Sequence, residues 1–195
     1  MMRNVIRMAG VALVGCGTAW GEGARPELSL ALGARNAGVG LLAPSGGDGE
    51  NAPETAGGSE ARRVTGARSH YLYVAISHPD YRTGPVDAYV SAEVFDDAVA
   101  RVTLQYDRAA RNPDLNSRYT QAEGTYLLLG SGRWRTLHFF LPQLRLGHGQ
   151  NHGADFRFNA PGVAFRRVAF SLSKPGGFDA ADRKSTRLNS SHTIQ

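Results

Sequence analysis

An alternation of apolar and polar residues is the clearest pattern in this sequence of 195 residues. Between residues 86 and 95 every second position is a valine or an alanine, and a similar alternation returns over 99–106. The segment 70–77, HYLYVAIS, is rich in aromatic and β-branched residues. A period of two is typical of a strand that buries one face, and such side chains favour strands. The pattern therefore predicts strands in these three segments.

Short turns separate further apolar segments and indicate how the strands are connected. Turn-forming residues interrupt the pattern at 96–97, 130–132 and 159–162. Flanking apolar segments predict three β-hairpins: 86–95 with 99–106, 124–129 with 133–141, and 154–158 with 163–173. No segment between 38 and 173 shows the apolar period of a helix. We therefore expect an all-β fold, an antiparallel β-sandwich.

The N-terminal residues have the composition of an export signal. Arg3 and Arg7 precede a short apolar stretch, and Gly15 and Cys16 follow it, which predicts a signal peptide over 1–15. The sequence LVGC at 13–16 resembles the lipobox of bacterial lipoproteins. This resemblance implies an acyl chain on Cys16 and a place in the cell envelope. The alternative is ordinary cleavage after 20–21, with export to the extracellular space and no anchor.

Most of the net positive charge lies in the two terminal segments of the chain. The formal charge of +5 alone would favour nucleic acid or an anionic membrane as a partner. Arg3 and Arg7 contribute two of these charges, and residues 182–195 contribute two more. This last segment resembles a translated sequencing adapter, so we expect it to be artefactual and disordered. Because the remaining body is nearly neutral, we expect no nucleic-acid partner, and membrane contact only through a lipid anchor.

Composition divides the rest of the chain into a tether and a folded module. Residues 16–37 are small and mixed, which suits a flexible tether. Residues 38–66 are rich in Gly and Pro, so composition alone would extend the tether through them, apart from a short apolar segment at 39–43. The strand pattern becomes clear from residue 69. Residues 174–181 follow the last predicted strand, and we expect them to begin a downstream segment that is truncated at 181.

Several short motifs resemble those of a known class of β-sandwich. They are VTLQYD at 102–107, GSGRWRT at 130–136, QN at 150–151, GADFR at 153–157 and RRV at 166–168. Together they are similar to a jelly-roll, galactose-binding-like module of secreted bacterial proteins, often attached to glycoside hydrolases. The resemblance covers 38–173, and it implies that the Gly-rich segments after residue 45 belong to the module. It also implies carbohydrate binding, although His152 stands where such modules often carry glycine.

Carbohydrate binding relies on exposed aromatic rings that stack on the C–H faces of sugars, and on polar side chains that bind hydroxyl groups. The period of two puts Trp134 on the strand face opposite to Leu137 and Phe139, where it would meet solvent. The alternative is that Trp134 belongs to the core. We expect the site to comprise Trp134, Tyr106, Asn151 and Arg157, with Tyr71, Tyr73, Tyr81, Tyr89 and Tyr119 as weaker aromatic candidates.

Two metal ions have candidate ligands in the sequence. Asp48 and Glu50 in a Gly-rich loop, with Asp155 at the start of a late strand, could converge on a structural Ca²⁺, which prefers oxygen ligands. The alternative for these residues is a turn that holds no ion. His148 and His152 would suit zinc on a helix, but the glycines around them disfavour a helix. The single cysteine excludes an internal disulfide and any site with several cysteine ligands.

Sequence motifs of common enzyme classes are absent from the chain. It has no GxSxG, HExxH or P-loop motif, and no GxGxxG motif after a strand. A glycosidase needs two facing carboxylates, and the sequence does not indicate such a pair. We therefore expect an exported, non-catalytic module for carbohydrate binding or adhesion. Two alternatives stay open: part of a larger polysaccharide-active enzyme whose catalytic domain follows residue 181, and a structural envelope domain that binds other proteins.

Overall fold

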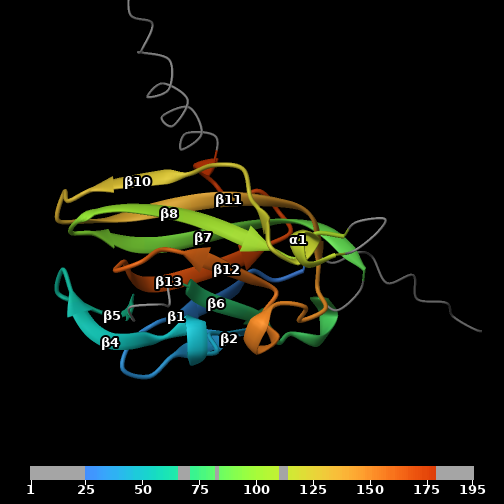
Figure 1. Cartoon of the computed structure of the whole chain (residues 1–195), viewed down its shortest axis with the longest axis horizontal. Coiled ribbons are helices and arrows are strands. Elements are labelled where there is room, and N and C mark those ends of the chain that lie inside the picture. The colour runs from blue at the N-terminus through green and yellow to red at the C-terminus, as the bar shows by residue number, and fades with distance from the viewer. Residues whose placement is uncertain (1–24, 66–70, 82–83, 110–113, 179–195) are drawn as a thin grey trace, which may run out of the picture.

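The computed structural model describes residues 25–65, 71–81, 84–109 and 114–178, and these form two stacked antiparallel sheets (Figure 1). The described part is an antiparallel β-sandwich, as the sequence predicts. The predicted signal peptide at 1–15, Cys16 and the segment 182–195 lie outside the described residues. Within the described ranges, no helix is long and apolar enough to cross a membrane.

Within these ranges, one sheet has seven strands and the other has six. The seven-stranded sheet has the spatial order β11 (Arg133–Arg145), β7 (Pro85–Asp96), β13 (Ala164–Ser171), β1 (Leu28–Ala31) and β2 (Ala37–Val39), with β5 (Ser59–Val64) and then β4 (Asn51–Ala56) beside β13. The six-stranded sheet has the order β10 (Tyr126–Leu129), β8 (Val99–Tyr106), β12 (Phe156–Asn159), β6 (Tyr71–Ile76) and β3 (Leu41–Leu42), with β9 (Thr120–Gln121) beside β8. The connections contain the short helical turns η1 (Gly47–Gly49), η2 (Pro79–Tyr81), α1 (Leu115–Arg118) and η3 (Asn151–Gly153).

The three predicted hairpins are wrong, because the two strands of each pair lie in different sheets. The chain passes from the seven-stranded to the six-stranded sheet between β7 and β8. It passes in the other direction between β10 and β11, and again between β12 and β13. In a sandwich every strand buries one face against the other sheet, whichever strand it pairs with. A period of two therefore cannot distinguish a hairpin, in which two consecutive strands pair, from a corner, at which the chain crosses to the other sheet. The repeated crossings give the jelly-roll arrangement.

The sandwich begins before residue 38, so the predicted tether 16–37 is too long. β1 lies within that segment and pairs with β13, and its residues Leu28 and Leu30 are at most 1% exposed. Residues 38–65 belong to the sandwich, as the resemblance implies and composition alone does not, because β4 and β5 form a hairpin there. This hairpin turns at Gly57 and Gly58, whose φ angles are 51° and 74°. Positive φ at both positions of a two-residue turn favours glycine, which explains the composition of this segment.

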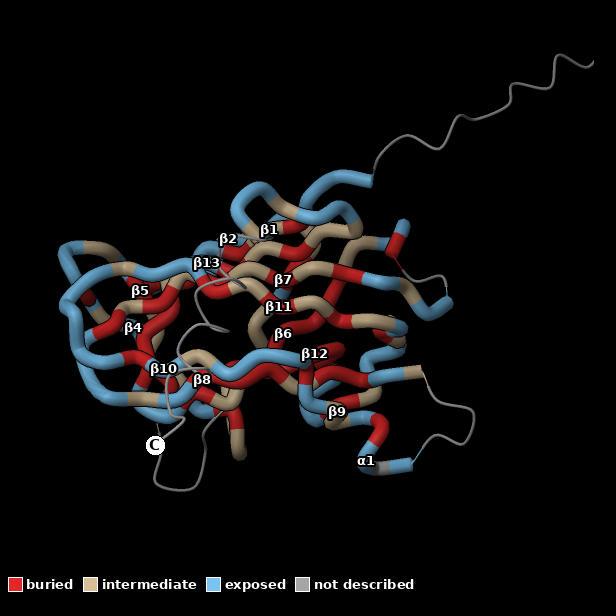
Figure 2. Tube along the Cα trace, turned by 90° about the horizontal axis from the view of Figure 1, so that it is seen from above, coloured by how far each residue is buried: buried red, intermediate tan, exposed pale blue. Residues whose placement is uncertain are grey.

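The hydrophobic core lies between the two sheets, where the buried residues of both inner faces meet (Figure 2). The alternation predicted for β7 is confirmed, because Ala88, Val90, Ala92 and Val94 are fully buried. The alternate residues of each strand are thereby left on the outer faces of the sandwich. Five fully buried phenylalanines fill much of the core: Phe139, Phe156, Phe158, Phe165 and Phe170.

The described part of the segment 174–181 packs on the sandwich. Phe178 contacts Tyr89 on the outer face of the seven-stranded sheet, with 5.1 Å between the ring centroids. It also lies 6.0 Å from the ring of His138. Residues up to 178 therefore belong to the folded module, which extends beyond the predicted boundary at 173.

Asp96 fixes the corner between β7 and β8. Its carboxylate accepts hydrogen bonds from the backbone N–H of Leu129 and Gly130 and from the Ser131 hydroxyl, at 2.7–2.8 Å, and the residue is 1% exposed. Burial acts to raise the pKa of Asp96, but the hydrogen bonds from Ser131 and the two backbone groups outweigh burial and lower it. We expect Asp96→Asn to reduce the free energy of unfolding by about 1–3 kcal/mol at neutral pH.

The same change should have a defined pH dependence, measured by urea unfolding. The pKa of Asp96 is lower in the folded than in the unfolded chain. Its stabilising effect is therefore fully present above the unfolded pKa and is lost as the pH falls through the folded pKa. The two proteins should consequently converge in stability at acid pH. Asp80→Asn, at an exposed side chain, is the control. A difference that persists in full at low pH would contradict this role of Asp96.

Candidate functional site

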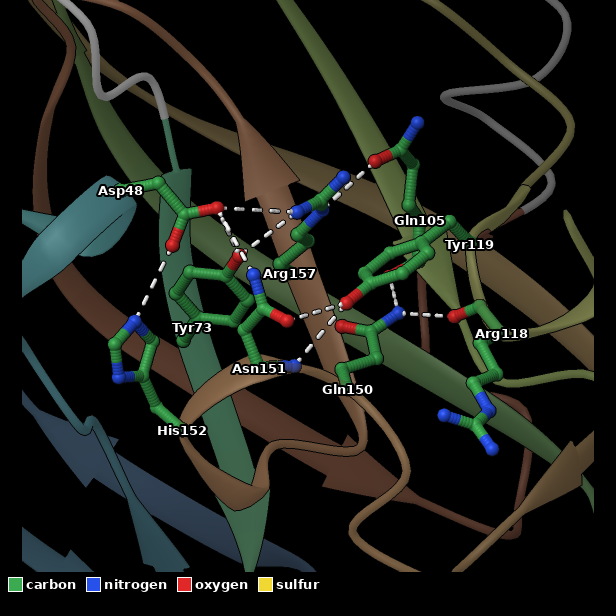
Figure 3. Close-up of polar contacts among 9 residues, drawn as sticks. All are labelled: Asp48, Tyr73, Gln105, Arg118, Tyr119, Gln150, Asn151, His152 and Arg157. Atoms are coloured by element: carbon green, nitrogen blue, oxygen red, sulfur yellow. Dashed lines mark hydrogen bonds and ion pairs between the residues drawn. The ribbon is translucent and has the colours of Figure 1, made fainter. Parts of the chain in front are cut away.

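A polar cluster lies on the outer face of the six-stranded sheet. Along β12, Phe156 and Phe158 point into the core, so Arg157 between them points outward. The register places Arg157 opposite Tyr73 on β6 and opposite Gln105 on β8. Residues from η1, from η3 and from the loop after α1 complete the group. We call the following residues the Arg157 cluster, most of which Figure 3 shows: Asp48, Tyr71, Tyr73, Gln105, Tyr119, Asn151, His152 and Arg157.

Arg157 is the centre of this cluster, and its side chain is almost completely buried. Its guanidinium lies between the rings of Tyr71 and Tyr119, 3.6 and 4.1 Å from their centroids. Nε donates a hydrogen bond of 2.8 Å to Oε1 of Gln105, and Nη1 donates one of 2.7 Å to the Tyr73 hydroxyl. A planar guanidinium suits stacking and hydrogen bonding at the same time. Arg157 therefore holds two half-buried tyrosine rings in fixed positions.

Asp48 supplies the negative charge of the cluster. Its Oδ2 accepts a hydrogen bond of 2.8 Å from the Tyr73 hydroxyl and one of 3.2 Å from Asn151, and it lies 3.7 Å from Nη1 of Arg157. Oδ1 lies 3.2 Å from Nε2 of His152. Burial acts to raise the pKa of Asp48, but the hydrogen bonds from Tyr73, His152 and Asn151 outweigh burial and lower it. The carboxylate of Asp48 is therefore ionised at neutral pH, and it faces the guanidinium of Arg157.

The hydroxyl of Tyr73 stays protonated under the same conditions. Tyr73 is fully buried between Asp48 and Arg157. Burial, together with the hydrogen bond to Asp48, raises its pKa to about 12. The phenol therefore acts as a donor to the carboxylate and as an acceptor for the guanidinium, and it links the two charged groups.

Gln150 attaches the loop of η3 to the six-stranded sheet. The residue is 5% exposed, and its Nε2 donates hydrogen bonds to the carbonyl oxygens of Arg118, at 2.7 Å, and Gln105, at 3.3 Å. Beyond it, Asn151 meets Tyr119, whose hydroxyl donates a hydrogen bond of 2.9 Å to Oδ1 of Asn151. Gln150 therefore fixes the loop of η3 on the sheet, and Asn151 is an exposed polar group that Tyr119 holds in place.

Asp155 attaches the other end of the same loop. It is fully buried, and its two carboxylate oxygens accept hydrogen bonds from the backbone N–H of Ile76 and of His148, both at 2.8 Å. Burial raises the pKa of Asp155, although these two hydrogen bonds oppose the shift. Nδ1 of His148 also lies 3.2 Å from Asp155. Asp155 is thus a structural residue that joins the loop to the end of β6.

The structure separates the four residues predicted to bind carbohydrate. Asn151 and Arg157 meet in the Arg157 cluster, as described above. Tyr106 is 2% exposed, and its hydroxyl donates a hydrogen bond to the carbonyl oxygen of Pro142. Tyr106 lies on the inner face of β8, so it cannot stack on a ligand. Gln105, the preceding residue of β8, points to the outer face and contacts Arg157, whereas Tyr106 points into the core.

Trp134 is on an outer face, as the period of two predicts, but a hairpin covers it. Its ring packs against Phe95, with 5.2 Å between centroids, and the guanidinium of Arg166 lies 4.4 Å above it. A Cβ atom added to Gly57, at the turn between β4 and β5, would lie only 2.9 Å from Nε1 of Trp134. Trp134 therefore belongs to a small second core on the seven-stranded sheet and is not an open platform.

The predicted calcium ligands Asp48, Glu50 and Asp155 do not form a common site. Asp155 directs both oxygens at buried backbone groups, Asp48 bonds to the Arg157 cluster, and Glu50 is exposed. His148 and His152 contact different carboxylates, those of Asp155 and Asp48. In the part of the chain that the structure describes, no three His, Cys, Asp or Glu side chains are placed to hold a metal ion.

The sequence pattern does not single out Gln105, and it gives Tyr71 and Tyr119 only as weaker candidates, although the structure brings all three to Arg157. The alternation with buried Leu72 and Val74 could have placed Tyr71 on an outer face. Its contact with Arg157 depends on the pairing of β6 with β12, which joins residues far apart in the sequence. Tyr119 follows α1 in an irregular segment, where no period indicates the direction of a side chain.

Solved structures that are similar to this chain include two carbohydrate-binding modules. No protein-family model and no curated protein sequence matches the chain. The carbohydrate-binding module CBM6cm-2 from Cellvibrio mixtus lichenase 5A, in complex with cellotriose, is 16% identical, with a TM-score of 0.36, and covers 64% of this chain and 88% of that one. The CBM22-1 xylan-binding domain from Paenibacillus barcinonensis Xyn10C is 12% identical, with a TM-score of 0.43, and covers 76% of this chain and 95% of that one.

Proposed function

We propose that this protein is a non-catalytic module that binds a polysaccharide on the outer face of the six-stranded sheet. The observation that carries this proposal is the pair of half-buried tyrosines, Tyr71 and Tyr119, which Arg157 holds in place. Aromatic rings that are already fixed lose little conformational entropy when a ligand binds. Their surfaces match the C–H groups of sugar rings, so a sugar chain would gain contact at small cost.

Polar groups for the hydroxyls of a sugar border these rings. Asn151 and Arg118 are both exposed, and Asn151 is held against the hydroxyl of Tyr119. Amide, guanidinium and phenol groups can together donate and accept several hydrogen bonds. Because Tyr119 and Asp48 already fix the side chain of Asn151, the face can select for the arrangement of hydroxyls along a chain.

The composition of the cluster favours binding without cleavage. Hydrolysis of a glycosidic bond usually needs two carboxyl groups on opposite sides of the bond. Asp48 is the one carboxylate of the Arg157 cluster, and its lowered pKa makes it a poor proton donor. Targeting or adhesion is therefore the activity that we propose for the module. An acyl chain on Cys16 would keep this activity at the cell envelope.

Native gels that contain soluble xylan, mixed-linkage β-glucan, galactomannan or pectin test this function. We expect at least one polysaccharide to retard the protein. Tyr71→Ala should then weaken binding about tenfold, which corresponds to about 1.4 kcal/mol of lost stacking. Tyr89→Ala is the matched control, because Tyr89 is half-buried on the outer face of the other sheet. Equal losses in both variants, or no retardation in any gel, would refute the proposal.

A further inference from the structure

Three exposed aliphatic side chains form an apolar patch at one end of the sandwich. Val99, Leu127 and Leu129 are 76%, 55% and 66% exposed, and we call them the Val99 patch. In the pairing of β8 with β10, Leu129 lies opposite Val99 and Leu127 opposite Arg101, and Leu128 between the two leucines is buried. These side chains therefore share the outer face of the six-stranded sheet. They lie where the corner between β7 and β8 meets the turn between β10 and β11 (Figure 1).

Two exposed arginines border the Val99 patch. Arg101 lies on the same face of β8, and Arg133 begins β11 directly after the turn. Within the described ranges, neither of them forms an ion pair. The two carboxylates of the adjoining corner are already occupied, because Asp96 accepts three hydrogen bonds and Asp97 pairs with Arg63 at 2.6 Å. The positive charge beside the patch therefore favours an anionic partner.

The backbone of β10 is poorly suited to pair with a further strand. β10 is an edge strand, and the outer N–H and C=O groups of such a strand would bind an added one. Nη1 of Arg135, however, already donates a hydrogen bond of 3.1 Å to the carbonyl oxygen of Leu127, and the N–H of Leu129 donates one of 2.8 Å to Asp96. Three aliphatic side chains also offer much less surface than the roughly 800 Å² that each partner buries in a standard protein complex. These observations favour a partner that needs neither an added strand nor a large interface.

We propose that the Val99 patch inserts into the surface of a lipid bilayer that contains anionic lipids. The aliphatic side chains enter the boundary between headgroups and acyl chains, and Arg101 and Arg133 contact the negative headgroups. A bilayer is fluid, so a small patch needs no complementary shape. This contact comes in addition to the lipid anchor that the sequence predicts at Cys16.

Membrane contact through the Val99 patch leaves the Arg157 cluster accessible. Val99 and Gln105 lie on the same face of β8 and are about 20 Å apart along the strand, at roughly 3.3 Å per residue. Apolar side chains at a membrane surface enter it by about 5–10 Å. A module bound in this way therefore holds its polysaccharide face outside the bilayer. Membrane contact goes beyond the proposed function and is independent of it, so either can fail without the other.

Sedimentation with lipid vesicles tests the apolar side chains, on a background of Cys16→Ala that excludes an acyl chain. We expect tighter binding to phosphatidylcholine vesicles with about 30% phosphatidylglycerol than to vesicles of phosphatidylcholine alone. Leu127→Ser combined with Leu129→Ser should weaken binding to the mixed vesicles by about tenfold or more. Leu42→Ser, at a leucine that is 56% exposed on β3, is the matched control and should leave binding unchanged.

Substitution of the two arginines tests the charge. Arg101→Gln combined with Arg133→Gln should remove the preference for phosphatidylglycerol. Arg35→Gln combined with Arg108→Gln, at two exposed arginines outside the patch, should keep it. Equal binding of the unsubstituted protein to both kinds of vesicle would contradict the role of these charges.

Fluorescence at position 127 reports insertion at the patch itself. Lipids that are brominated in their acyl chains should quench the added fluorophore of Leu127→Trp, and should not quench that of Leu42→Trp. Vesicle binding that the two serine substitutions leave intact, an equal loss in Leu42→Ser, or no quenching in Leu127→Trp overturns the proposal. If thermal melting shows that the double serine variant does not fold, the quenching experiment decides. A dimer that forms without vesicles and that the same two substitutions dissociate also overturns it, and assigns the patch to a second copy of the chain.

Discussion

Replacement of Asp155 by alanine should lower the free energy of unfolding by about 3–5 kcal/mol, because it removes a buried group that serves several partners. The variant leaves the backbone N–H groups of Ile76 and His148 without their acceptor in a place that water does not reach. It also removes the carboxyl group that faces His148. Urea unfolding followed by tryptophan fluorescence and by circular dichroism measures the loss.

The control for this prediction is Asp80→Ala, since Asp80 is exposed and its contact with His78, at 3.9 Å, is long. It should change the free energy of unfolding by less than about 0.5 kcal/mol. Asp155→Asn should be intermediate, because one amide oxygen can still accept a hydrogen bond while the NH₂ group faces a donor. An alanine variant as stable as the wild type would show that the loop of η3 is held by other contacts.

Replacement of Arg157 by leucine should weaken polysaccharide binding by about 30-fold to 100-fold, or roughly 2–3 kcal/mol. Leucine removes the group that lies between Tyr71 and Tyr119, so both rings become free to rotate. It also leaves Asp48 and the Tyr73 hydroxyl without their cationic partner. Isothermal titration calorimetry with the polysaccharide that retards the protein in gels measures the affinity.

Two variants make this prediction specific. Arg157→Lys keeps the charge but cannot stack between two rings or donate in two directions, so we expect most of the loss to remain. Arg101→Leu removes an exposed arginine from β8 in the same sheet and should leave affinity unchanged. If Arg157→Leu binds as tightly as the wild type while it stays folded, the tyrosine pair is not the ligand platform.

The sequence predicts most strands of the fold because burial on one face leaves a period of two. β6, β7 and β8 appear close to their predicted bounds for this reason. β1 is missed because its four residues are too few for a period, and their neighbours look like a flexible tether. The strand pairing is not predicted, because the residue pattern of a strand indicates which of its faces is buried but not which strand it pairs with. For this reason the sequence pattern predicts hairpins at three places where the chain instead crosses from one sheet to the other.

The candidate site is predicted only in part, for a related reason. Arg157 and Asn151 are found because the GADFR and QN motifs resemble those of known modules. The same reasoning predicts a ligand role for Trp134. The turn at Gly57 covers this side chain, however, and that turn lies more than seventy positions earlier in the sequence. Asp155 is predicted as a metal ligand, whereas its partners are backbone groups. Composition and motifs identify polar residues, but only the tertiary structure shows whether each one faces a ligand or its own chain.

The pairing of β1 with β13 has a consequence for how the module can be joined to other domains. Because the two strands are antiparallel and Leu28 lies opposite Phe170, the first strand begins beside the end of the last strand, and Phe178 then packs on Tyr89 of β7, two strands away from β1 in the same sheet. A unit with adjacent ends can be inserted into a surface loop of a host domain while the two sides of that loop stay close together. Its sheet-face site lies on the other sheet, so it would remain open after such an insertion.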